Sequence, residues 1–198
     1  YIQTRTKMMY PIGNALKSIL DKILTDPRWD LKFIGMQVII EGLALAAFQA
    51  SRDLTKDPVF RDMLGLIIRD EARHVTFGIN YLEEFVDTLT EQEKEDRAQF
   101  AYEACWLSRE RLVSMEVFEH FGMDAEEARQ FQLSSDITQL FQKLLFSRVM
   151  PNLRRIGLLR DSVKDKFEDL GILEYASAQS DAHIAVSYTH LTLPTKQD

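Results

Sequence analysis

The sequence has little of the residues that build covalent frameworks and turn-rich folds. It contains one cysteine (Cys105), five prolines and eight glycines in 198 residues. A single cysteine excludes an internal disulfide framework and suits a reducing compartment, so we expect a cytoplasmic protein. So few prolines and glycines argue against a sandwich or a barrel, because those folds need many tight turns.

Positive charge is also in the minority, since 24 Lys and Arg face 31 Asp and Glu and give a formal net charge of −7. Nucleic-acid binders and polybasic membrane-surface proteins need a basic face, so we expect neither partner. Long uncharged runs are absent as well. The most apolar stretch, residues 33–48, is shorter than the ~20 residues of a membrane span. It contains Gln37 and Glu41, and it predicts a buried core helix.

Up to about residue 150, the apolar residues recur at helical spacing, and this periodicity predicts an all-α fold. Asp26-Pro27 and Asp57-Pro58 each predict a cap followed by a first-turn proline, and Thr90 with Glu93 forms a capping box. The predicted helices begin at Pro11, cover about residues 29–54, 58–89 and 90–121, and continue after Asp124.

The C-terminal part is less regular. An apolar stripe between Ile137 and Val149 predicts a helix that Pro151 should end or bend. Residues 186–198 have no helical stripe and look like translated sequencing-adapter read-through, with a flexible polar terminus as the alternative. We therefore expect residues 1–185 to form one partial helical domain and residues 186–198 to carry no site.

Three residues on two predicted helices are candidates for a functional site. Glu71 and His74 form a Glu-x-x-His motif, which puts both side chains on one helix face. Glu41 and Glu71 each lie about 20 Å from the turn between the helices, at ~1.5 Å per residue, and are therefore level in an antiparallel hairpin. A carboxylate in so apolar a helix costs several kcal/mol unless it is paired or metal-bound. Glu41, Glu71 and His74 are therefore predicted metal ligands.

The stretches QVIIEGLALAAF and IIRDEARHVTFG resemble the second helix pair of the ferritin-like di-iron carboxylate superfamily. The nearest branches are the ribonucleotide-reductase small-subunit-like oxidases and oxygenases, and the resemblance covers about residues 29–89. It implies a ferritin-like antiparallel bundle and an iron pair, with manganese as the second choice of metal. It also implies O₂ as co-substrate, a small organic substrate, and an electron donor or reductase.

The resemblance assigns supporting roles too. Asp70 matches an aspartate that orients a ligand histidine on a partner helix, and Arg69 would be a charge partner in the same run. Residues one turn from the metals are candidates for an oxygen or substrate pocket, although at helical spacing such residues more often belong to the core. They are Gln37, Leu45, Phe48, Phe77 and Gly78.

The chain departs from the family pattern in two ways. A full dinuclear site takes a Glu from each of two helices and a Glu-x-x-His from each of two others, and this chain carries half of that set. We expect the other half upstream of Tyr1, with a homodimer of this helix pair as the alternative. With three of six ligands, the chain alone should bind metal weakly and be inactive as an oxidase or oxygenase. Ile67 stands where arylamine N-oxygenases carry an extra histidine, which disfavours N-oxygenation.

Other interpretations stay open at this point. Glu71 and His74 can form a surface ion pair, Glu41 can pair with Arg73, and Asp70 can belong to an ordinary helix salt bridge. Iron storage or detoxification, and a metal-free helical interaction protein, are the alternatives to a di-iron oxidase or oxygenase.

Overall fold

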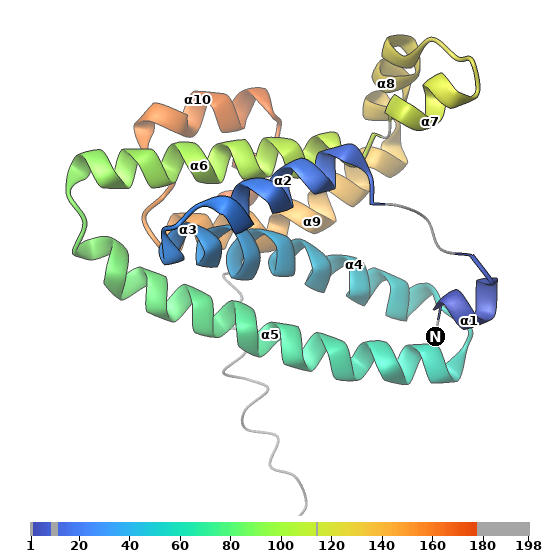
Figure 1. The fold of residues 1–198 in the computed structure, drawn as a ribbon, viewed down its shortest axis with the longest axis horizontal. Coiled ribbons are helices and arrows are strands. Elements are labelled where there is room, and N and C mark those ends of the chain that lie inside the picture. Colours follow the sequence, from blue (N-terminus) through green and yellow to red (C-terminus); the bar gives the residue numbers. More distant parts are fainter. Residues whose placement is uncertain (1, 9–11, 114, 178–198) are drawn as a thin grey trace, which may run out of the picture.

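The structure, a computed structural model, describes residues 2–8, 12–113 and 115–177. These residues form helices and turns without a strand, which confirms the all-α prediction for this part of the chain. The predicted helix start at Pro11 and the unusual tail, residues 186–198, lie outside the described residues. In chain order the elements are α1 (Ile2–Thr6), α2 (Asn14–Thr25), α3 (Trp29–Phe33), the π-helical η1 (Ile34–Ile40), α4 (Glu41–Leu54), α5 (Pro58–Asp87), α6 (Glu91–Glu110), α7 (Met115–His120), α8 (Ala125–Ser134), α9 (Asp136–Arg155), α10 (Asp161–Asp169) and the 3₁₀-helical η2 (Leu173–Ser177) (Figure 1).

Local capping signals fix the starts of the two long helices after α4. The Asp57 carboxylate accepts hydrogen bonds from the backbone N–H groups of Val59 and Phe60, and Pro58 occupies the first turn of α5. Thr90 and Glu93 form the predicted reciprocal capping box at the start of α6. Both starts are therefore set by short-range chemistry that the sequence displays directly.

Two helix boundaries differ from the prediction. The helix expected over 90–121 is interrupted after Glu110, where Leu112 and Val113 turn back on Arg109 and Glu110 through backbone hydrogen bonds. Val113 is buried there, so tertiary packing ends α6 although no glycine or proline marks the place. Asp26 does not cap the next helix, because its carboxylate accepts from the backbone N–H of Arg28, and Arg28 is the residue that precedes α3.

Helix α9 continues through Pro151 to Arg155. The proline removes one backbone donor, but Val149 and Leu153 on either side of it are fully buried, and this packing offsets the lost hydrogen bond. Gly157 ends the helix with a φ of 76°, and the N–H of Leu158 closes the turn by donating to the carbonyl of Leu153. The first part of the predicted stripe differs, because Ile137 and Leu140 are exposed.

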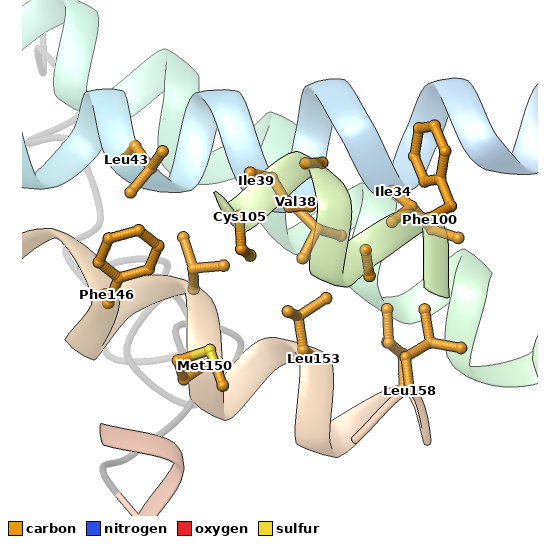
Figure 2. Packing of buried hydrophobic residues seen from close by; sticks show 14 of the residues in the cluster. Ile34, Val38, Ile39, Leu43, Phe100, Cys105, Phe146, Met150, Leu153 and Leu158 are labelled. Carbon is orange, nitrogen blue, oxygen red and sulfur yellow. The ribbon is translucent and has the colours of Figure 1, made fainter. Parts of the chain in front are cut away.

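The hydrophobic core lies between α4, η1, α6 and α9. Figure 2 shows Leu43 facing Phe146, with Ile39 and Val38 close to Cys105 of α6. Helix α9 packs against α4, and α2 packs against α6. Helix α5 pairs with α4 as an antiparallel hairpin and runs along the edge of the molecule (Figure 1). Apart from the turns at its ends, α5 is thus covered mainly on the side that faces α4 and η1.

The continuous helical stretch Trp29–Leu54 is, among the described residues, long and apolar enough to cross a membrane. Half of its most apolar window is buried inside the protein. The core helix of a soluble protein and a membrane span can have the same length and apolar composition. The absence of a membrane partner therefore stays a prediction.

Candidate metal centre

Glu41 begins α4 at the point where the π-helical segment η1 ends. A π-helical turn closes hydrogen bonds five residues apart, one more than an α-helical turn, and such segments occur frequently at functional sites. The segment itself contains the buried residues Ile34 and Ile39, so its irregular backbone is held by the core. The irregularity therefore ends at Glu41, the one carboxylate of the apolar stretch 33–48.

The structure brings Glu41, Glu71 and His74 together across the α4–α5 hairpin. One ligand atom from each of the three side chains lies within 4.8 Å of the other two. The Glu71 Oε2 and His74 Nδ1 atoms, on successive turns of α5, are 3.4 Å apart. The side chain of His74 is 59% exposed and that of Glu71 is 26% exposed, so the group is open to solvent from the α5 side.

The electrostatics of this group favour binding of a cation. Burial raises the pKa of the Glu41 carboxyl, and the neighbouring Glu71 carboxylate raises it further, while His74 offsets part of the shift. The Glu41 Oε2 atom is buried and has no hydrogen-bond partner. A buried acceptor without a partner costs free energy, and a metal ion placed between the two carboxylates would remove this cost.

The donor set fits a divalent ion with hard or borderline character. Two ligand atoms that bind one ion at about 2.0–2.2 Å lie no more than about 4.4 Å apart. The Glu71–His74 pair already meets this condition, and a ligand atom of Glu41 lies within 4.8 Å of both. Mixed carboxylate and imidazole ligands suit iron, manganese or zinc better than calcium or magnesium.

Asp70 and Arg69 do not join this group. Asp70 is exposed and forms an ion pair with Arg73, with the Arg73 Nη1 atom 3.1 Å from its Oδ1 atom. Arg73 therefore pairs with Asp70, three residues before it on the outer face of α5, and not with Glu41. Arg69 is exposed on the same helix. The roles that the resemblance implies for these two residues need a partner helix, and they stay predictions.

The predicted pocket residues divide between core and surface. Leu45 and Gly78 are buried, Phe48 and Gln37 are partly buried, and Phe77 is 60% exposed. The amide oxygen of Gln37 is buried without a hydrogen-bond partner, one helical turn from Glu41. A separate open groove of about 660 Å³ lies over α7, α8 and the loop before α9, where Phe118, Met123 and Phe131 line it.

A partly exposed aromatic row lies next to the three ligands, and only its Phe77 was predicted from the sequence, as a pocket residue. Its rings contact one another at centroid distances of 4.5–6.1 Å and come from α3 and α5. The spacing of these residues in the sequence contains the signal. On one helix, steps of four residues connect the aromatic residues with Glu41. On the other helix, aromatic residues recur every four residues after His74. The row comprises Trp29, Phe33, Phe77, Tyr81 and Phe85.

Gly78 allows η1 and α5 to approach closely beside the ligands. A Cβ atom at this position would lie 2.6 Å from the Cβ of Gln37. We expect Gly78→Ala to destabilise the protein by about 1–3 kcal/mol, because the two helices must separate. Gly65→Ala is the matched control, since its Cβ would lie 3.6 Å from Arg52 Nε and alanine stabilises an α-helix by up to about 1 kcal/mol. Urea unfolding of both variants measures the difference, and an equal stability for both would contradict the close approach.

Comparison of the chain with protein-family models, curated proteins and solved structures gives no match.

Proposed function

We propose that the chain forms half of a ferritin-like di-iron carboxylate bundle, that Glu41, Glu71 and His74 bind iron, and that the protein uses O₂ to oxidise a small organic substrate. Manganese is the alternative metal. The observation that carries this proposal is the meeting of two carboxylates and one imidazole within 4.8 Å on an otherwise apolar helix pair. Support also comes from the unpartnered Glu41 oxygen and from the π-helical segment that ends at Glu41.

Each ligand has a role that follows from its surroundings. Glu41, fixed by the buried α4 and η1, supplies an oxygen from the core side. Glu71 and His74 supply an oxygen and a nitrogen from the more exposed α5 side, and their 3.4 Å separation suits one shared ion. Iron held by these residues would supply the electrons that reduce O₂, and the exposure of His74 and Glu71 keeps the ligand group open to solvent.

The apolar surroundings of the ligands favour an uncharged or aromatic substrate group. Phe77 lies one turn beyond His74, Phe33 lies two turns before Glu41, and the rings of Phe33 and Phe77 contact each other across the two helices. Such rings exclude water from part of the surface beside the ligands and offer stacking contacts. The Asp70–Arg73 pair is the nearest exposed charge pair on α5.

Anaerobic titration of the purified chain with Fe(II), followed by addition of O₂, tests the proposal. We expect about one iron per chain, bound weakly because the chain carries half of the ligand set, and any O₂ consumption should depend on the bound iron. His74→Ala should lower iron binding strongly, whereas His120→Ala, on α7 against Phe121, should leave it unchanged.

The outcome that would contradict an oxidase is equally concrete. Storage of many irons per chain would favour iron storage instead, because a storage protein accumulates metal beyond its ligand count. Iron binding that is the same in the His74→Ala and His120→Ala variants would reject the metal centre altogether.

A further inference from the structure

Helices α7 and α8, residues 115–134, form an arm that lies outside the hydrophobic core. Figure 1 shows the arm standing apart at one end of the bundle, and its two helices pack mainly against each other and against α9. Neither helix contains a buried residue. Polar contacts hold the arm in place, because Arg129 Nη2 donates to Glu110 Oε1 at 2.9 Å and Gln132 Nε2 donates to the Leu112 carbonyl at 3.0 Å. The apolar side chains of the arm are therefore not used to build the core.

These apolar side chains line the open groove of about 660 Å³ over the arm. Phe131 is 77% exposed, Met123 is 53% exposed, and Phe118 lines the groove with them. On the first turns of α9, Ile137 and Leu140 are exposed as well. Large apolar side chains that gather on one exposed surface are typical of interaction sites. The groove therefore has the composition of a docking surface.

Negative charge surrounds this groove. Residues 115–140 contain six acidic side chains and a single Lys or Arg, Arg129, which is already paired with Glu110. Asp124 and Glu127 line the groove itself, and Glu127 has no ion-pair partner among the residues that the structure describes. The acidic residues are Glu116, Glu119, Asp124, Glu126, Glu127 and Asp136. An occupant with positive charge would therefore find free carboxylates at the edge of the groove.

This charge distinguishes between the kinds of occupant. Nucleic acids and anionic lipid surfaces would be repelled, because both carry negative charge. A second copy of the chain is disfavoured in the same way, since its formal net charge is −7 and the groove placed against itself would bring two acidic edges together. A cationic partner with an apolar face gains from both the groove and its edge. Charge complementarity therefore favours a basic, amphipathic partner.

The shape of the partner follows from the secondary structure of the arm. An extended peptide usually binds by adding a strand to a free sheet edge, and the described residues contain no strand. An amphipathic helix instead lays its apolar face into an apolar groove between helices. Helix α8 has ten residues, a length of about 15 Å, so about three turns of a partner helix extend along it.

We propose that the groove over α7 and α8 binds a basic amphipathic helix of a partner protein. Apolar side chains of that helix, spaced at i, i+3, i+4 and i+7, enter between Phe118, Met123 and Phe131. Met123 adapts its flexible side chain to the apolar residues that it receives. Lys and Arg residues beside the apolar face of the helix pair with Asp124 and Glu127. This inference is independent of the metal centre.

A synthetic peptide, added to the full chain, is the probe for this groove. The peptide is fluorescently labelled, has about 14 residues or four helical turns, and carries leucine at the four apolar spacings and lysine elsewhere. We expect fluorescence anisotropy to give a dissociation constant on the order of 10 μM, which rises with salt because charge contributes to binding. A peptide with the leucines dispersed around the helix, or with glutamate in place of lysine, should bind at least about tenfold more weakly.

Two matched pairs of substitutions locate the binding surface. Phe131→Ala should weaken peptide binding at least about tenfold, whereas Leu66→Ala, at a 55% exposed position on α5, should leave it unchanged. Glu127→Lys should weaken binding at least about threefold more than Glu126→Lys, because both residues lie in the first turn of α8 and only Glu127 lines the groove. Urea unfolding of the four variants reports whether each remains folded.

Several results would overturn the proposal. No saturable binding up to about 1 mM peptide, equal binding of the dispersed or glutamate peptide, or equal effects within either pair of variants would reject the helix-binding groove. A dimer that forms with increasing concentration and that Phe131→Ala abolishes would assign the groove to a second copy. Binding to phosphatidylcholine vesicles that Phe131→Ala abolishes would assign it to a membrane surface instead.

Discussion

Replacing Glu71 with alanine is expected to lower the affinity for Fe(II) or Mn(II) at least about 100-fold, since loss of an outer-sphere partner alone costs 10–100-fold at metal sites. Glu71 is the residue that connects the other two ligands, because its Oε2 atom lies 3.4 Å from His74 Nδ1 and its charge acts on Glu41. Without it, one oxygen on the core side and one nitrogen on the solvent side remain, and they cannot hold an ion firmly. Isothermal titration under argon measures the change.

The metal-free protein gives a second readout that distinguishes ligand loss from misfolding. Removing Glu71 removes the repulsion that raises the pKa of Glu41, so the apo variant should be at least as stable as the parent chain. Glu84→Ala is the matched control, because Glu84 is exposed on the same helix and lies outside the ligand group. Equal losses of affinity in the two variants, or an unfolded Glu71→Ala protein, would contradict this assignment.

Phe146→Ala should have the largest effect on stability, about 3–5 kcal/mol in the free energy of unfolding. Phe146 is fully buried on α9 and faces Leu43 of α4, so the substitution opens a cavity in the layer that supports the ligand helix (Figure 2). The helices around it cannot collapse into the space because Gly42 and Val149 already bring α4 and α9 into contact. Urea unfolding measures the loss as a lower midpoint at an unchanged slope.

Phe131→Ala provides the comparison for Phe146→Ala. Phe131 is 77% exposed on α8, so the same chemical change there removes little buried area and should cost less than about 1 kcal/mol. Similar losses in the two variants would show that α9 does not pack on α4 as described. Phe146 does not belong to the ligand group. The Phe146→Ala variant should therefore be less stable as a folded protein but should bind the same number of metal ions per chain.

The sequence predicted those parts of the fold that depend on neighbours along the chain. The starts of α5 and α6 follow from Asp57 and Thr90, whose side chains bond to backbone groups two or three residues away. The end of α6 could not be predicted, because Val113 turns inward for tertiary reasons and no glycine or proline accompanies it. The continuation of α9 through Pro151 likewise depends on burial against α4.

The same distinction applies to the candidate site. The proximity of Glu41 to Glu71 follows from helix rise and turn length, both of which can be read from the sequence. The exposed state of Phe77 could not be read in this way, since helical spacing gives a face its composition and does not state what covers that face. The unpartnered oxygen of Gln37 is also a tertiary property, since it depends on which groups surround this side chain in the fold.

The π-helical segment η1 has a consequence for insertions and deletions in this helix. It sets the rotational register between Trp29 and Phe33, which precede it, and Glu41, which follows it. Removing one residue from the segment would turn the aromatic side chains by about 100° relative to the carboxylate, the rotation of one α-helical residue. Every ligand and every ring would still be present, but they would no longer share one face. The length of this helix, as much as its composition, therefore encodes the site.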